Sequence, residues 1–264
     1  MKNILITNDD GYEADGLKAL IEALRPLGRL TIVAPAAEKS SCGHSLTLTR
    51  PLKFVSVGDD FYKLDDGTPS DCVYLALHSL FADSKVDLVV SGINRGANLG
   101  EDMTYSGTVA GAMEAALNGA SAIAISQYMS KKEDGGYDYD YDYDLAAKTA
   151  REIVTKVFDG GFPLPPRQLL NINIPHVSAD RCKGWKITQG GGRIYRNEAL
   201  RRTNPRGEEY FWLGAHPLDF IPTENGDYEA VVDGFVSITP VMCDLTARAS
   251  IARLQSWING EDKR

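Results

Sequence analysis

Short apolar runs alternate with amphipathic stretches along the first two-thirds of the chain. Runs of strand length occur at residues 3–7, 30–35, 86–92, 121–126 and 168–175. Stretches with helical patterning occur at residues 14–28, 68–82, 107–119 and 145–158. In the first of these, Leu17, Leu20, Ile21 and Leu24 repeat with the spacing of one helix face. The alternation predicts an α/β fold, a mostly parallel sheet with helices on both faces.

Local signals refine this pattern between the second strand and the second helix. Short alternating runs at 46–49, 52–57 and 61–64 predict a hairpin excursion. Thr68 and Pro69 are residues preferred at the N-cap and at the first position of a helix. We therefore expect the second helix to begin there.

The pattern changes at about residue 176. Strand-like runs occur at 185–189, 209–214 and 234–240, and an arginine-rich polar segment covers 191–209. These features predict a β-hairpin arm and a strand that closes the sheet. The arginines of the arm could bind a substrate, but a solvated hairpin is the simpler interpretation.

A helical pattern over 245–260 is expected to trail from the fold. We divide the chain into an α/β core over 1–175 and an appendage over 176–264, which together form a single functional domain. The arm and the trailing helix are expected to contact other subunits. Residues 131–144, which repeat Tyr and Asp, are typical of a solvated loop rather than of a binding surface.

Charge restricts the classes of ligand. The 264 residues include 36 acidic residues and 28 Lys or Arg residues, a formal net charge of −8. This balance argues against binding to nucleic acid, which requires a basic patch to neutralise phosphates. An anionic small substrate would also be repelled by the protein at large, so it would need a local cation from a metal or from helix N-termini.

Cysteine and histidine usage gives no sign of a disulfide framework or a zinc site. The four cysteines and four histidines are scattered and form no CxxC or HExxH pair. The N-terminus carries no secretion signal, and no apolar run approaches the ~20 residues of a membrane span. We therefore expect a cytoplasmic protein without membrane contact.

Oxygen-bearing side chains follow three of the predicted strands. They are Asn8, Asp9 and Asp10 after the first strand, Ser40 and Ser41 after the second, and Asn94 and Asn98 after the strand at 86–92. Ligands of open parallel sheets bind outside the carboxyl ends of the strands, so we expect these loops to meet. Their oxygens suit a hard cation such as Mg²⁺ or Mn²⁺. Each loop alone could be a simple turn, but together they favour a metal site.

The third loop continues into a helix through the segment "YSGTVAG". Ser106, Gly107 and Thr108 would offer backbone N–H groups and two hydroxyls at the positive end of that helix, which suits an anionic oxygen. Taken alone, the segment is better explained as an ordinary N-cap. Beside a metal it predicts a phosphate pocket. Arg95 is the cation of the same loop; it could contact the substrate, but an exposed arginine is at least as simple an interpretation.

Several longer segments carry a family resemblance. In chain order they are "ILITNDDGY", "IVAP", "SLTLT", "GTPSDCVYLAL", "VVSGINRGANLGEDMTYSGTVAGAMEAA", "LNINIP" and "GFVSITPVMCDLT". With these segments the chain resembles the SurE family of survival proteins, which are 5′-nucleotidases that act on nucleoside monophosphates. The segments span nearly the whole sequence.

The resemblance implies a Rossmann-like sheet, one divalent cation per subunit, Mg²⁺ or Mn²⁺, and a homodimer or homotetramer with exchanged C-terminal segments. The metal ligands that it implies are Asp9, Asp10, Ser40 and Asn94. The residues that we assign to the substrate phosphate are Asn8, Asn98, Ser106, Gly107 and Thr108.

The chain departs from the family pattern at several positions. The family usually follows the serine ligand with glycine, whereas Ser41 follows Ser40 here, so the choice of serine stays open. Met103, Gly111 and Ala115 also differ, at positions that we expect to serve packing. The Tyr-Asp repeat lies outside the family pattern.

The expected reaction is metal-dependent hydrolysis of nucleoside 5′-monophosphates, with other phosphate monoesters or short polyphosphate as further substrates. Asp9 and Asp10 are the candidate catalytic residues. They would either position an attacking water or attack the phosphorus directly, and the sequence leaves both open. Among the histidines, His44 is the best candidate for protonating the leaving oxygen, but a surface histidine is the simpler interpretation.

Two other classes of protein share parts of this pattern. A phospho-accepting receiver domain also begins with a strand and paired acids, but it needs an acceptor Asp and a Lys at later strand ends. The segments "VDLVVSGIN" and "SAIAISQ" lack both. A non-catalytic, metal-dependent nucleotide-binding protein on the same scaffold is the remaining alternative, because fold alone does not establish activity.

Overall fold

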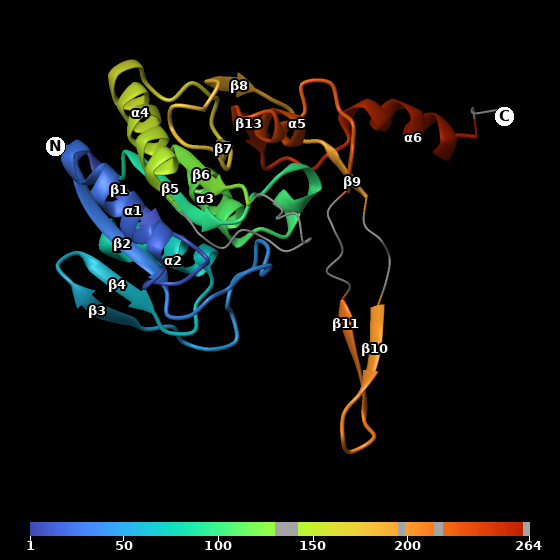
Figure 1. Ribbon diagram of the computed structural model, residues 1–264, viewed down its shortest axis with the longest axis horizontal. Coiled ribbons are helices and arrows are strands. Elements are labelled where there is room, and N and C mark those ends of the chain that lie inside the picture. The colour runs from blue at the N-terminus through green and yellow to red at the C-terminus, as the bar shows by residue number, and fades with distance from the viewer. Residues whose placement is uncertain (130–141, 195–198, 214–218, 261–264) are drawn as a thin grey trace.

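A nine-stranded sheet forms the centre of the computed structural model, which describes residues 1–129, 142–194, 199–213 and 219–260 (Figure 1). In sheet order its strands are β3 (Phe54–Gly58), β4 (Phe61–Leu64), β2 (Arg29–Pro35), β1 (Asn3–Thr7), β5 (Leu88–Arg95), β6 (Ala122–Gln127), β7 (Gln168–Ile174), β13 (Val236–Met242) and β8 (Trp185–Ile187).

Most neighbours in this sheet are parallel, as the sequence predicted. The six strands from β4 to β7 pair in parallel. The strand β3 is antiparallel to β4, and β13 is antiparallel to β7. The chain runs from β1 to β2 on one side and later returns to β5 on the other. Strand order therefore reverses between β2 and β5, around β1, where ligand sites of open sheets form.

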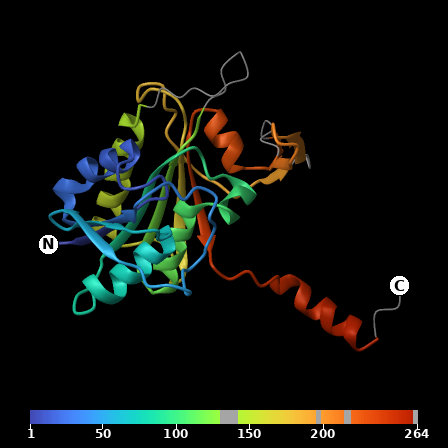
Figure 2. The same ribbon diagram turned by 90° about the horizontal axis from the view of Figure 1, so that it is seen from below.

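Helices cover both faces of the sheet (Figure 2). The helices α1 (Asp15–Leu24) and α4 (Asp144–Gly160) cover one face, and α2 (Pro69–Leu75) and α3 (Gly107–Leu117) cover the other. Side chains of β1 alternate between the two cores. Ile4 and Ile6 belong to the core under α1 and α4, whereas Leu5 belongs to the core under α2 and α3. Burial on both faces explains the continuous apolar runs of these strands.

The start of α2 matches the expected N-cap. The Thr68 hydroxyl accepts from the Asp71 backbone N–H, and the Asp71 carboxylate accepts from the Thr68 N–H, which forms a capping box. A π-helical turn, Ala76–Leu80, continues α2. The predicted hairpin exists as β3 and β4, but β4 joins β2, so the hairpin is the edge of the main sheet. The run at 46–49 forms no strand.

The C-terminal part combines an arm with two further strands of the main sheet. The arm projects from the body (Figure 1) and consists of β9 (Gly192–Ile194) paired with β12 (Asp219–Ile221), and β10 (Ala199–Thr203) paired with β11 (Glu209–Leu213). The strand predicted at 234–240 is β13, which lies between β7 and β8, so the edge strand of the sheet is β8, within the run predicted at 185–189.

Two C-terminal helices differ from expectation. The helix α5 (Asp227–Val232) was not predicted, because six residues are too few to establish a helical repeat. The predicted helix at 245–260 is shorter: a 3₁₀ turn, Arg248–Ser250, precedes α6 (Ile251–Ile258). In the described parts of the chain, no helix is long and apolar enough to cross a membrane. Most of the Tyr-Asp repeat lies outside those parts.

Candidate active site

The loop after β1 buries polar side chains. Asn8 is fully buried and Asp9 is 3% exposed. The Asn8 amide nitrogen donates to the Gly11 carbonyl at 2.9 Å. Its Oδ1 atom is buried and has no hydrogen-bond partner among the described residues. A buried acceptor without a partner is costly, so it is typical of a site that a ligand or water completes.

Asp9 connects this loop to two other segments. Its Oδ1 atom accepts from the Thr108 hydroxyl at 2.5 Å, and its backbone carbonyl accepts from the Lys39 N–H at 2.7 Å. Burial raises the pKa of Asp9 to about 6; the charge of Asp10 also raises it, and the Thr108 hydroxyl lowers it. The surrounding protein therefore does not fully compensate a charge on Asp9.

Asp10 connects the same loop to the end of β5. Its Oδ2 atom accepts from the Arg95 backbone N–H at 2.9 Å. Burial raises the pKa of Asp10, and the hydrogen bond from Arg95 opposes this rise. The nearby Glu38 raises it further. Two poorly solvated carboxylates in adjacent positions are stabilised when a cation lies between them.

The loop after β2 carries two serines. The Ser40 hydroxyl donates to Glu38 Oε1 at 2.8 Å, and Ser41 has a φ angle of 58°. This left-handed conformation favours glycine, so the serine here carries a conformational cost. Both serines line the pocket described below. Position 41 therefore keeps the left-handed backbone conformation that glycine would adopt, although the residue is serine.

Asn94 lies at the end of β5. Its amide nitrogen donates to the Gly96 carbonyl at 2.7 Å, which orients the amide group. The side chain is 8% exposed. In this orientation Oδ1 is the remaining acceptor of the side chain.

Asn98 belongs to a buried hydrogen-bond network that was not predicted from the sequence. Its backbone N–H donates to Asn173 Oδ1 at 2.8 Å, and its amide nitrogen donates to the Ser126 hydroxyl at 2.7 Å. Its carbonyl accepts from Asn171 and Asn173 at 2.8 and 3.1 Å. The signal was present in "LNINIP", where two asparagines of a buried strand share one face. The ends of β6 and β7 therefore fix the third loop.

The N-terminus of α3 abuts Asp9. The Ser106 hydroxyl accepts from the Val109 N–H at 3.0 Å and acts as the N-cap. A Cβ atom on Gly107 would lie 2.8 Å from Asp9 Cβ and Oδ2 and 3.0 Å from Cys42 Sγ. Gly107 is thus required for the close approach of helix and carboxylate. The Thr108 hydroxyl, assigned above to the phosphate, is engaged by Asp9.

These loops line one pocket, hereafter the site pocket, with a volume of about 460 Å³. Its wall contains residues of all three loops together with residues of the arm; those assigned above are Asp9, Ser40, Asn94, Asn98 and Ser106. In the described chain, no group of three or more His, Cys, Asp or Glu side chains is placed to hold a metal ion. A metal here would need hydroxyl and amide oxygens beside the two carboxylates.

His44 lies apart from the wall of the site pocket. Its Nε2 atom is 2.7 Å from Oε2 of Glu114, a buried residue two turns along α3 from Gly107. The same carboxylate accepts from Asn118 at 2.8 Å. The contact anchors the loop that carries Ser40 to the side of α3.

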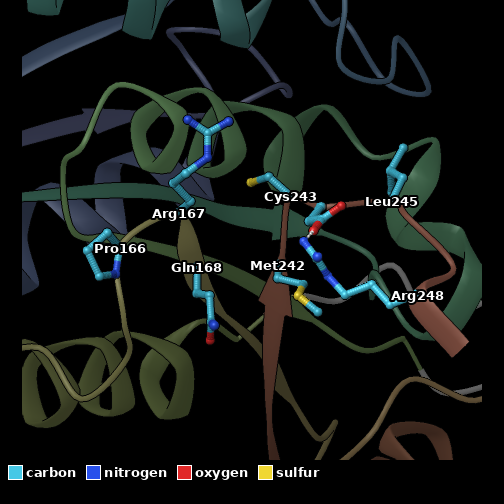
Figure 3. A pocket seen from close by; sticks show the side chains of 8 residues that line it. Pro166, Arg167, Gln168, Met242, Cys243, Leu245 and Arg248 are labelled. Atoms are coloured by element: carbon cyan, nitrogen blue, oxygen red, sulfur yellow. Dashed lines mark hydrogen bonds and ion pairs between the residues drawn. The ribbon is translucent and has the colours of Figure 1, made fainter.

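A second cavity, of about 600 Å³, lies at the opposite edge of the sheet (Figure 3). It is formed where β7 begins and β13 ends, and its lining includes Arg167, Gln168, Met242, Cys243 and Arg248. Asp244 pairs with Arg248 beside it. None of the residues assigned from sequence lines this cavity.

Comparisons with known proteins agree with the fold and extend over the whole chain. A model of the family described as survival protein SurE matches residues 4–197. A 5′-nucleotidase SurE of a Nitratiruptor species is 57% identical over 266 residues, covering 98% of this chain and 100% of that protein. One of Campylobacter jejuni subsp. jejuni is 53% identical, covering 100% of both chains. A crystal structure of a SurE protein from Aquifex aeolicus has a TM-score of 0.82 and 40% identity, covering 97% of this chain and 99% of that one.

Proposed function

The chain belongs to the SurE family, and we infer that it is a 5′-nucleotidase, which hydrolyses nucleoside 5′-monophosphates to nucleoside and phosphate. The main support for this inference is the site pocket. It lies where the strand order reverses around β1, and carboxylate, hydroxyl and amide oxygens meet there beside the N-terminus of α3. Other phosphate monoesters and short polyphosphate fit the same chemistry.

We assign one divalent cation per subunit, Mg²⁺ or Mn²⁺, to Asp9, Asp10, Ser40 and Asn94. The donor set fits, because it contains only hard oxygen atoms and includes two carboxylates whose burial disfavours their charge. When bound, the cation supplies a Lewis acid that neutralises the phosphoryl oxygens. The hydrogen bonds from Thr108 to Asp9 and from Arg95 to Asp10 would hold the two carboxylates in place for it.

The remaining residues receive the phosphate and direct the attack. The Gly107 N–H and the Ser106 hydroxyl hydrogen lie at the positive end of α3 and would donate to phosphate oxygens as charge builds up. Thr108 acts through Asp9. The carboxylates of Asp9 and Asp10 orient the attacking water, and direct attack by one of them is the alternative route.

Removal of divalent metal tests this function. We expect the full-length protein to release phosphate from AMP or GMP, EDTA to abolish release, and excess Mg²⁺ or Mn²⁺ to restore it. The measurement is phosphate release at fixed enzyme concentration, with thermal melting to show that the chelated protein stays folded. Binding of AMP without turnover under every metal condition would instead favour the non-catalytic alternative.

We also propose that the protein is a homo-oligomer, a dimer or tetramer whose C-terminal segments are exchanged. The helix α6 extends away from the body (Figure 2), and its large apolar side chains Ile251, Leu254, Trp257 and Ile258 are 55–65% exposed. These four side chains cluster on one side of the helix. An eight-residue helix is too short to be stable alone, so this side needs a partner surface.

Trp257→Glu is expected to lower the oligomeric state, because a charge replaces a large apolar contact. Sedimentation of the full-length protein measures the change. Ala252→Glu adds the same charge on the opposite side of α6 and should leave the mass unchanged. Equal masses for wild type and Trp257→Glu would contradict the exchange of this helix.

A further inference from the structure

The base of the arm, residues 190–194, is fixed against the third site loop. Asp227, a fully buried carboxylate at the start of α5, holds both segments. Its Oδ2 atom accepts from the Gly100 N–H at 2.7 Å, and its Oδ1 atom accepts from the Gly191 N–H at 3.1 Å. A buried carboxylate whose oxygens bind two segments costs free energy to disrupt, so these bonds hold the arm base against the loop.

Further contacts join the same two segments. Glu101 Oε2 accepts from the Arg193 backbone N–H at 3.0 Å, and the Arg193 guanidinium forms an ion pair with Asp102. Gly100 has a φ angle of 51°, and a Cβ atom there would lie 2.2 Å from the Gly191 carbonyl oxygen. Figures 1 and 2 both show the arm base beside the loop around residue 100.

This junction places Arg193 and Asp102 in the wall of the site pocket. Their side chains are 13% and 15% exposed, so the pair is held largely inside the protein. The pocket extends from Asp9 and Ser106 to this pair, and its volume of about 460 Å³ lies within the ~300–1,000 Å³ of pockets that enclose whole small molecules. A phosphate group occupies only a part of such a space.

We propose that the Arg193–Asp102 pair is the nucleoside-facing wall of the site pocket and that Arg193 is a specificity-determining residue. The inference rests on the proposed nucleotidase function, because it identifies what the non-phosphate end of that pocket receives. Asp227 is a positioning residue that holds the arm base, and with it Arg193, against the loop that continues to Ser106.

The chemistry of the pair suits a neutral, hydroxylated and planar group. Because Asp102 offsets the charge of Arg193, the pair adds little net attraction for the phosphate. The Asp102 carboxylate can accept hydrogen bonds from ribose hydroxyls, as acidic residues do in dinucleotide-binding sites. The planar guanidinium can stack on a base, and it already lies 5.9 Å from the Phe220 ring centre on the arm.

The test compares binding of a nucleotide with binding of phosphate alone. The full-length protein, saturated with Mg²⁺, is titrated calorimetrically with inorganic phosphate and with a phosphonate analogue of AMP, in which a methylene group replaces the ester oxygen. We expect Arg193→Met to raise the Kd of the analogue about tenfold, equivalent to ~1.4 kcal/mol, and to change the Kd of phosphate less than about twofold.

Two further variants make the result decisive. Arg25→Met removes a surface arginine that pairs with Glu22, and it should change neither Kd. Arg193→Lys keeps the charge without the planar fork; it should weaken binding of the analogue even if Arg193→Met melts too early to be titrated. An equal loss for both ligands, or no loss for the analogue in either Arg193 variant, overturns the proposal. A wild-type protein that binds the analogue with this discrimination but hydrolyses no AMP would instead overturn the proposed function alone.

Discussion

Asp10→Asn is expected to reduce metal-dependent hydrolysis of AMP by about 10³-fold while the protein stays folded. The substitution keeps an oxygen that can accept the Arg95 N–H but removes one of the two charges assigned to the cation. Turnover at saturating Mn²⁺ and the metal-induced shift in melting temperature measure the two losses, because a metal that binds only the folded protein stabilises it.

The same substitution should not destabilise the metal-free protein. Burial disfavours the charged form of Asp10, so a neutral side chain of equal size removes an electrostatic cost. Asp15→Asn is the matched control, since Asp15 is an exposed residue of α1 that pairs with Lys18. Activity of Asp10→Asn within tenfold of that of Asp15→Asn would exclude Asp10 as a metal ligand.

Gly107→Ala is the second large expected effect. The added methyl group would lie 2.8 Å from Asp9 Cβ and Oδ2, so the helix start, Asp9 or both must move. Because Asp9 is proposed to hold the cation and to orient the attacking water, we expect this displacement to lower kcat/KM about 10²-fold and the overpacking to cost ~1–3 kcal/mol of stability. Steady-state kinetics and chemical denaturation measure the two effects.

Gly160→Ala provides the comparison. Gly160 is the last residue of α4, and a Cβ atom there would meet nothing within 4 Å. Alanine has the higher helix propensity, so this variant should be neutral or slightly more stable, with unchanged kcat/KM. If Gly107→Ala behaved in the same way, the close packing of α3 against Asp9 would have no functional role.

The residue types that line the candidate site could be predicted because they lie in short segments of the chain. Two adjacent acids after an apolar strand, serines after the next, and asparagines after a third share the carboxyl edge of one sheet, and strand order brings that edge together. Local residue type was enough at the start of α2, where Thr68 is the N-cap and Pro69 follows it as expected.

Other parts of the site depend on contacts that no local pattern encodes. The network of Asn98 with Asn171 and Asn173 joins residues more than 70 positions apart. From the sequence, Arg193 could not be distinguished from the other arginines of a solvated arm. In the structure, Asp227 of the unpredicted helix α5 holds the arm base against Gly100, and this contact places Arg193 at the pocket. Hydrophobic periodicity reports which face of an element is buried, not which distant segment covers it.

The sequence by itself determined the class of fold, the three loops and the kind of atoms that they carry, because period and residue type act over a few neighbouring positions. Only the tertiary structure decided which hydroxyl donates a hydrogen bond to Asp9, why position 107 must be glycine, and which part of the arm lines the pocket. Those features arise from packing and from the desolvation of buried polar groups, and both depend on segments that meet only after the chain has folded.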